Sequence, residues 1–340
     1  MPDSAPPSVP RPLAADIPRF EPHGALCNSF LQTTLAARRP YRHDTSGMQA
    51  VATSEVLNCG AGVRLAASLS RHPQARSIAV LIHGWEGSQD SVYLHNLACA
   101  LYTAGHSVLR LNLRDHGGSH ALNELPFHSA RIAEVIGACR AAQALVPGVP
   151  LICIGYSLGG NFALRIGLYG PEHSLHPALC VGVSPAIDPR ATVEAIDAHP
   201  IYRHYFLRKW RADLFNKIAA WPGCYDGFRH LAQHDHFVSA TEEFAERFTE
   251  FRDGGAYLQA YTLAPAQLLE SPTPLAILTA QDDPVIPFAG FSELHEGTGI
   301  RALLTPLHGG HCGFIRNWSL DCWSEEAVVQ LAGRVAEGRL

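Results

Sequence analysis

The sequence of 340 residues contains neither a long hydrophobic run nor a run of basic residues. No stretch approaches the 18 or more consecutive apolar residues that a transmembrane helix needs. The net charge of −5, without a basic patch, disfavours nucleic acid as a partner. The proline-rich first residues lack the hydrophobic region of a signal peptide. We therefore expect a cytoplasmic protein with no membrane span.

Cysteine pairs with metal-binding spacing are also missing. The nine cysteines are scattered, odd in number and include no C-x-x-C pair. This pattern indicates neither a disulfide framework nor a zinc site, and it fits a reducing compartment. The histidines at 116 and 120, and the group at 234–236, do not form an H-E-x-x-H pattern. We expect no metal centre.

The sequence does contain the alternation typical of a mixed fold. Apolar residues make up 47% and charged residues 17%, as in a globular protein. From about residue 48, short apolar runs alternate with amphipathic segments, which predicts a mostly parallel sheet with helices on both faces. The expected strands lie at 48–57, 63–70, 77–84, 107–114, 150–157, 178–185, 274–281 and 301–307. The expected helices lie at 91–104, 126–145, 158–169 and 323–337.

One long stretch interrupts this alternation. It has helical patterns but no convincing buried strand, and Ser239-x-x-Glu242 matches a capping box that opens a helix. Of the 29 aromatic residues, 14 lie at 202–261. These rings either form the core of a helical subdomain or line an apolar pocket over the active site. The expected organisation is a flexible tail at 1–20, a core made of 21–184 and 273–340, and a helical lid at 185–272.

The pentapeptide Gly155-Tyr156-Ser157-Leu158-Gly159 matches G-x-S-x-G. It follows an apolar run and precedes a helical pattern, which is the context of a nucleophile elbow. The glycines leave room for a serine in a strained backbone geometry, and the start of the helix stabilises developing negative charge. Ser157 is therefore the predicted nucleophile. The alternative is an ordinary glycine-rich turn.

A serine hydroxyl needs a base, and the base needs an orienting carboxylate. In enzymes built on such an elbow, the acid and then the histidine follow the serine along the chain. His311, in a glycine-containing loop after the last strand, is the predicted base, with His308 as the competitor. Asp283 follows the preceding strand and is the predicted acid, with Asp282 as the runner-up.

Two backbone N–H groups should form the oxyanion hole. Leu158 follows the nucleophile and supplies the first. Trp85 lies in the loop after an early apolar strand and supplies the second, while its side chain also fits the rim of a pocket. His83, just before this loop, is expected to be structural rather than catalytic.

With these residues in place, the chain resembles the YheT-like branch of the α/β-hydrolases over about residues 27–335. The resemblance implies the α/β-hydrolase fold, a Ser-Asp-His triad, no cofactor and an esterase or lipase-like activity. Trp85 stands where relatives often have a smaller residue, and Asp115 stands where many α/β-hydrolases have glycine. The motifs that carry the resemblance are Leu31-Gln32-Thr33, His83-Gly84, the elbow, the Asp-Asp-Pro turn at 282–284 and Gly309-Gly310-His311-x-Gly313-Phe314.

Together these features predict a serine hydrolase that cleaves carboxylic esters through an acyl-enzyme. An acyltransferase would use the same triad, with an alcohol or thiol in place of water. A catalytically inactive binding protein is the third hypothesis. The aromatic residues at 202–261 favour a small-molecule ester with an apolar acyl group as the substrate.

Overall fold

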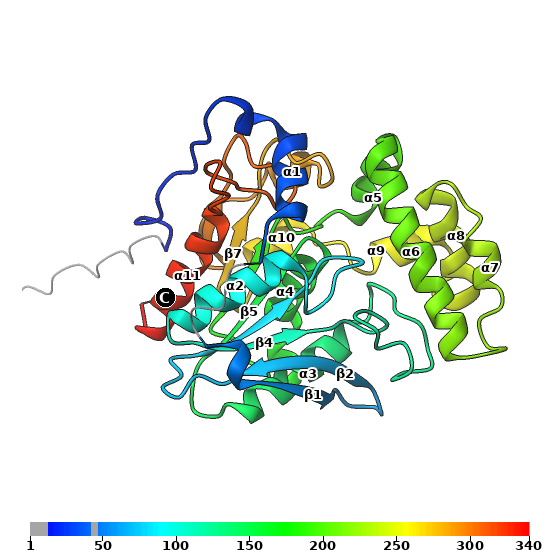
Figure 1. Cartoon of the computed structure of the whole chain (residues 1–340), viewed down its shortest axis with the longest axis horizontal. Coiled ribbons are helices and arrows are strands. Elements are labelled where there is room, and N and C mark those ends of the chain that lie inside the picture. The colour runs from blue at the N-terminus through cyan, green and yellow to red at the C-terminus, as the bar shows by residue number, and fades with distance from the viewer. Residues whose placement is uncertain (1–12, 42–46, 340) are drawn as a thin grey trace, which may run out of the picture.

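Eight strands form one sheet, in the order β1-β2-β4-β3-β5-β6-β7-β8 (Figure 1). The computed structural model describes residues 13–41 and 47–339. β2 pairs antiparallel with both β1 and β4, and the other neighbours are parallel. The predicted fold class and all eight predicted strands are confirmed. The strands are β1 (Ala52–Asn58), β2 (Arg64–Ser70), β3 (Ile78–Ile82), β4 (Ser107–Leu111), β5 (Leu151–Tyr156), β6 (Leu179–Val183), β7 (Leu275–Leu278) and β8 (Ile300–Leu304).

Helices cover both faces of the sheet. α2 (Val92–Thr103) packs with α11 (Trp323–Ala336) on one face, and α3 (Ile132–Leu145) packs with α4 (Leu158–Tyr169) on the other. The central strands are buried along their whole length. They read as unbroken apolar runs because a parallel sheet with two covered faces exposes neither side of a strand.

The helix predicted from residue 126 begins later, at Ile132. The backbone before it is held in an open loop by side chains from elsewhere. The N–H of Phe127 donates to Asp115 over 2.8 Å, and Arg165 donates to the carbonyl oxygens of Ser129 and Ala130 over 2.7 and 3.0 Å. These long-range bonds satisfy backbone groups that a helix would otherwise pair.

Between β6 and β7 the chain forms helices and no strand, as predicted for residues 185–272. We call this segment the helical insertion. In Figure 1, α5 to α9 stand together beside the sheet. The helices are α5 (Pro189–Ala198), α6 (Pro200–Ala220), α7 (Phe228–Leu231), α8 (Phe237–Phe248), α9 (Gly254–Gln259) and α10 (Pro265–Leu269).

The capping box predicted at Ser239 is wrong, because α8 already begins at Phe237. Its start is capped from another helix. The carboxylate of Asp197, in α5, accepts the N–H groups of Phe237 and Val238 over 2.8 and 2.9 Å. Such an acceptor satisfies the orphan donors of a helix start, whichever part of the chain it comes from.

The flexible tail predicted at 1–20 is wrong in its second part. Residues 1–12 lie outside the described residues, but Leu13, Ile17 and Phe20 are buried. Phe20 contacts the ring of Trp323 at 5.5 Å between centroids, and the indole N–H of Trp323 donates to the carbonyl of Pro18 over 2.6 Å. Burial of these apolar side chains against α11 fixes residues 13–20.

Short elements complete the fold. α1 (Ser29–Arg38) lies in Figure 1 at the end of the sheet where the chain between β8 and α11 passes. Within the described residues, no helix combines the length and apolar character required to cross a membrane. The 3₁₀ helices are Gly24–Cys27, Gln49–Val51, Pro171–His173 and Phe288–Phe291.

Candidate active site

Ser157 occupies a sharp turn between β5 and α4. Its φ of 53° and ψ of −118° lie in a region that non-glycine residues rarely adopt. The elbow needs its glycines, because a Cβ on Gly155 would lie 1.9 Å from the oxygen of Gly159, and one on Gly159 would lie 2.3 Å from the oxygen of Ile82. The N–H of Ser157 donates to Val183 over 2.8 Å. The turn therefore holds the hydroxyl at the carboxyl end of the sheet.

Three predicted side chains meet at this turn in one hydrogen-bonded series. His311 Nε2 lies 3.0 Å from Ser157 Oγ, and His311 Nδ1 lies 2.9 Å from Asp283 Oδ2. The second carboxylate oxygen of Asp283 accepts the N–H groups of Val285 and Ile286 over 2.8 and 2.9 Å. The Asp283 side chain is fully buried. This arrangement can move a proton from the serine to the histidine while a buried charge stabilises the imidazolium.

The two alternative candidates, Asp282 and His308, lie outside this hydrogen-bonded series. Asp282 accepts the N–H of Gly310 over 2.9 Å, and its other oxygen lies 3.4 Å from Nδ1 of His308. The His308 side chain is 41% exposed. Asp282 therefore fixes the loop that carries His311, and neither competitor touches Ser157 or His311 within the described hydrogen bonds.

The pKa of His311 lies well above its ordinary value. Burial alone would lower this pKa, but the negative charge of Asp283 beside Nδ1 outweighs the burial. By contrast, the pKa of His83 lies well below its ordinary value, because this ring is buried and adjoins His116. His83 Nε2 accepts the N–H of Leu113 over 3.1 Å and Nδ1 bonds the carbonyl of Gly84, so this histidine holds the loop after β3.

The two predicted oxyanion residues both adjoin Ser157. Leu158 is the first residue of α4, so its N–H has no acceptor within the helix. The loop after β3 passes directly against the nucleophile, since a Cβ on Gly84 would lie 3.2 Å from Cβ of Ser157. Trp85 follows Gly84, and Trp85, Leu158 and Ser157 line the same cavity.

Two residues of α1, whose role we did not deduce from the sequence, hold the loop of His311. Thr33 Oγ1 accepts the N–H of His311 over 2.9 Å. The buried amide of Gln32 donates to the carbonyl of Ile315 and accepts its N–H, over 2.9 and 2.7 Å. A Cβ on Gly310, whose φ is 55°, would lie 2.4 Å from a backbone oxygen of α1. The Leu31-Gln32-Thr33 motif was the sequence signal that could have indicated this role. Its contacts with the loop of Gly310 and His311 explain why the chain carries both motifs.

Comparison with known proteins places this chain in a family. The family model Hydrolase_4, described as serine aminopeptidase, S33, matches residues 73–305. The chain belongs to this family of α/β-hydrolases. This S33 hydrolase is also 25% identical over 259 residues to "Putative esterase YheT" of Escherichia coli (strain K12), covering 73% of this chain and 74% of that protein. The resemblance to YheT-like hydrolases is thereby confirmed.

Solved structures share the fold of this S33 hydrolase. The Pyrococcus furiosus esterase Pf2001 is 13% identical with a TM-score of 0.57, over 87% of this chain and 97% of that one. The structure of EstE5 is 16% identical with a TM-score of 0.54, over 93% of this chain and 99% of that one. At these identities the likeness concerns the fold.

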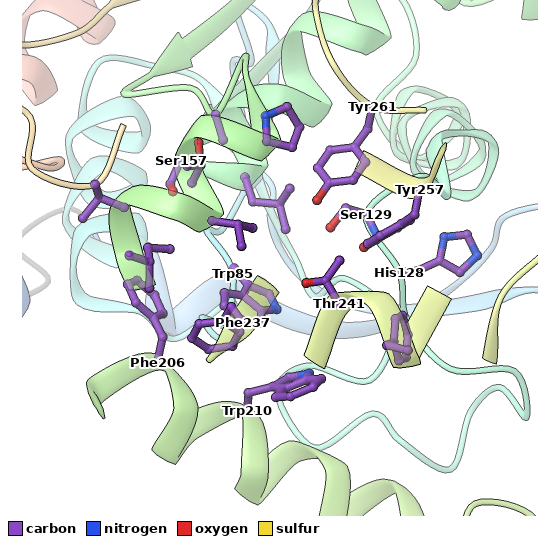
Figure 2. Close-up of a pocket in the computed structure, with 18 of the residues that line it drawn as sticks. Trp85, His128, Ser129, Ser157, Phe206, Trp210, Phe237, Thr241, Tyr257 and Tyr261 are labelled. Carbon is purple, nitrogen blue, oxygen red and sulfur yellow. The ribbon is translucent and has the colours of Figure 1, made fainter. Parts of the chain in front are cut away.

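A cavity of about 120 Å³ opens beside Ser157, between the core of the S33 hydrolase and its helical insertion (Figure 2). Trp85 forms its rim, with ring centroids 5.7 Å from Phe206 and 5.0 Å from Phe237. Further apolar lining comes from Val193, Ile196, Trp210 and Phe244. Other rings of the insertion, including Tyr225 and Phe228, form its own small core. Both readings of the aromatic-rich segment are therefore correct for different residues.

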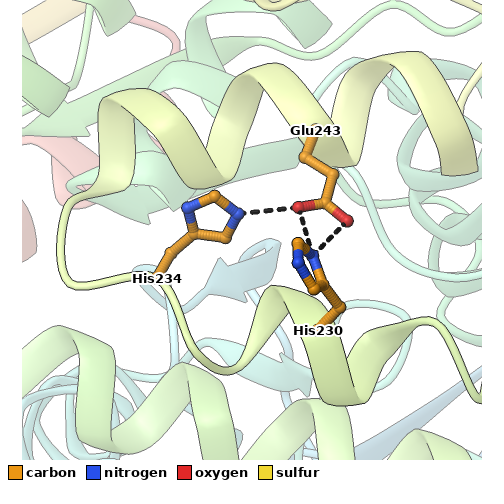
Figure 3. Close-up of side chains that lie close together, drawn as sticks. All are labelled: His230, His234 and Glu243. Carbon is orange, nitrogen blue, oxygen red and sulfur yellow. Dashed lines mark hydrogen bonds and ion pairs between the residues drawn. The ribbon is translucent and has the colours of Figure 1, made fainter.

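One group of side chains in the described part of the S33 hydrolase has donors suited to a metal ion (Figure 3). Glu243 lies 2.8 Å from Nδ1 of His230 and 2.7 Å from Nε2 of His234. Glu243 also pairs with Arg247, one turn along α8. Imidazole and carboxylate are zinc donors, but here they already form an ion-pair network that links α7 to α8. His116 and His120 do not join it, because they bond Arg114 and Asp213.

Proposed function

We propose that this S33-family hydrolase cleaves carboxylic esters through an acyl-enzyme on Ser157. The observation that carries the proposal is the unbroken series from Asp283 through His311 to Ser157, set in the wall of a cavity. The names of YheT and Pf2001, both described as esterases, support the same reaction.

In the proposed mechanism, His311 Nε2 takes the proton of Ser157 as the hydroxyl oxygen attacks the ester carbonyl. Asp283 holds the imidazole in the required tautomer and stabilises its charge. The N–H groups of Trp85 and Leu158 donate to the developing oxyanion. His311 then gives its proton to the leaving alcohol, and water repeats the sequence to release the acid.

The cavity favours an ester over the N-terminal amine of a peptide. An aminopeptidase must bind a positively charged α-ammonium group, and burial of that charge needs an opposite charge nearby. None of the described residues that line the cavity is acidic. We therefore assign a neutral ester as the substrate and treat the helical insertion at 185–272 as the lid that covers it.

The apolar walls predict a preference for an apolar acyl group. Each methylene moved from water to such a wall contributes about 0.8 kcal/mol, or roughly a fourfold gain. With p-nitrophenyl esters from C2 to C12, kcat/KM should rise from acetate to an optimum and then fall. A flat or falling series from C2 would refute the apolar pocket and leave the proposed chemistry standing.

A cavity-filling variant sharpens this test. Ile196→Trp places a larger side chain in the cavity wall and should move the optimum to shorter chains. Ile201→Trp is the matched control, because Ile201 is 57% exposed and does not line the cavity. An equal shift in both variants would show that the chain-length preference arises elsewhere.

A further inference from the structure

Four hydroxyl groups gather on one wall of the mostly apolar cavity. They belong to Ser129, Thr241, Tyr257 and Tyr261, which Figure 2 draws close together across the cavity from Ser157. Ser129 lies in the loop before α3, whereas the other three come from the helical insertion. Core and insertion thus meet at this wall, which we call the hydroxyl wall.

Contacts from the core fix the hydroxyl wall in place. The N–H of Ser129 donates to the phenol oxygen of Tyr257 over 3.0 Å, and the side chains of Ser129 and Tyr261 also hydrogen-bond this phenol. Arg165 donates to the carbonyl of Ser129 over 2.7 Å, and Asn161 donates to the carbonyl of Tyr261 over 2.8 Å. The rings of Tyr257 and Tyr261 lie 5.2 Å apart. The hydroxyl groups are therefore positioned before any ligand arrives.

The wall is polar but uncharged. Burial raises the pKa of Tyr257 and raises that of Tyr261 well above its ordinary value, so both remain phenols that can donate. Burial, aided by Arg131, lowers the pKa of the neighbouring His128 to about 3 and keeps this ring neutral. Nδ1 of His128 is buried and has no hydrogen-bond partner among the described residues. An unpaired polar atom such as this one is costly to bury unless a ligand or water pairs with it.

We infer that the hydroxyl wall binds an uncharged oxygen acceptor, a ketone carbonyl, on the part of the substrate that enters the cavity. The inference rests on the proposed ester hydrolysis and narrows its substrate to esters of oxo-acids. Each hydroxyl on the wall can donate one hydrogen bond to an acceptor on the ligand, such as a ketone oxygen. No charged side chain lines the cavity within the described residues, so a carboxylate or ammonium group would have no direct ion-pair partner there.

The test compares p-nitrophenyl octanoate with oxo-octanoates that carry the ketone at successive positions from C4 to C7. In the wild type, at least one oxo isomer should match or exceed octanoate in kcat/KM. Tyr261→Phe removes one hydrogen-bond donor. It should lower the ratio of kcat/KM for that isomer to kcat/KM for octanoate about tenfold. Tyr205→Phe is the control, because Tyr205 is outside the cavity lining and 39% exposed, and it should leave the ratio unchanged.

The outcomes separate the inference from the proposed function. If every oxo ester is slower than octanoate by a factor that Tyr261→Phe does not change, the hydroxyl wall does not recognise a ketone and ester hydrolysis stands. If Tyr261→Phe unfolds the protein, Thr241→Val and Ser129→Ala are used in its place, because each also removes a single hydrogen-bond donor from the hydroxyl wall.

If the wild type does not hydrolyse octanoate, the proposed function fails and ligand binding tests the wall. The fluorescence of Trp85 and Trp210, which line the cavity, then reports ligand binding. The affinity for octanones is compared with the affinity for octane. Tyr261→Phe must weaken ketone binding about tenfold and leave octane binding unchanged. Equal effects on both ligands overturn the inference.

Discussion

Adjacent aspartates should respond very differently to the same substitution. Asp283→Asn should abolish most turnover, whereas Asp282→Asn should change it little. Asp283 bonds His311 Nδ1 with one oxygen and accepts the N–H groups of Val285 and Ile286 with the other. Asp282 instead accepts the N–H of Gly310 with one oxygen, and its other oxygen lies 3.4 Å from Nδ1 of His308.

The magnitude follows from these bonds. An asparagine at 283 keeps its carbonyl oxygen on the two N–H groups, which turns its amide nitrogen toward His311 Nδ1. Nδ1 must then accept, so the proton sits on Nε2 and the ring cannot take the proton of Ser157. We expect kcat to fall about 10³- to 10⁴-fold, or roughly 4–5.5 kcal/mol. An asparagine at 282 can still accept from Gly310, so kcat should stay within about threefold.

The pH dependence supplies a second readout. Only neutral His311 acts as a base, so kcat/KM of the wild type should rise with pH through a pKa above the ordinary histidine value. Asp283→Asn removes the charge that raises this pKa, so the rise of its residual activity should move to lower pH. Asp282→Asn should keep the wild-type profile.

Turnover of a p-nitrophenyl ester from pH 5 to 10 measures both effects, with thermal unfolding to check that each variant folds. Equal losses in the two variants, or a larger loss at 282, would refute the reasoning. An Asp283→Asn profile that keeps the wild-type midpoint would show that this carboxylate does not control the titration of His311.

Three further predictions concern the elbow and α1. Ser157→Ala should lose turnover and fluorophosphonate labelling, while Ser157→Gly should gain about 1 kcal/mol in unfolding free energy because glycine tolerates a φ of 53°. Denaturant unfolding measures this free energy. A Ser157→Gly variant less stable than the wild type would contradict the view that the backbone at Ser157 is strained. Gln32→Leu should lose about 2–4 kcal/mol, because it leaves buried groups of Ile315 and Leu26 unpaired. An unchanged unfolding midpoint would show that α1 does not anchor the loop of His311.

The sequence by itself determined the features that depend on neighbours along the chain. An apolar run, a G-x-S-x-G and a helical pattern together predict a strand, a strained turn and a helix around Ser157. The central parallel strands β3, β5 and β6 were recognisable because each is buried on both faces and forms an unbroken apolar run. The chain order of nucleophile, acid and histidine then pointed to the turn at 282–283 and to the loop of His311.

Only the tertiary structure decided the features that depend on contacts between distant residues. Asp282 and Asp283 are the same residue type, and the path of the turn after β7 determines which carboxylate meets His311. α8 begins where Asp197, forty residues upstream, caps it. Residues 13–20 are held by packing against α11. Local pattern fixes which conformations a segment favours, but a buried polar group or ring is satisfied by whichever residue the fold brings to it.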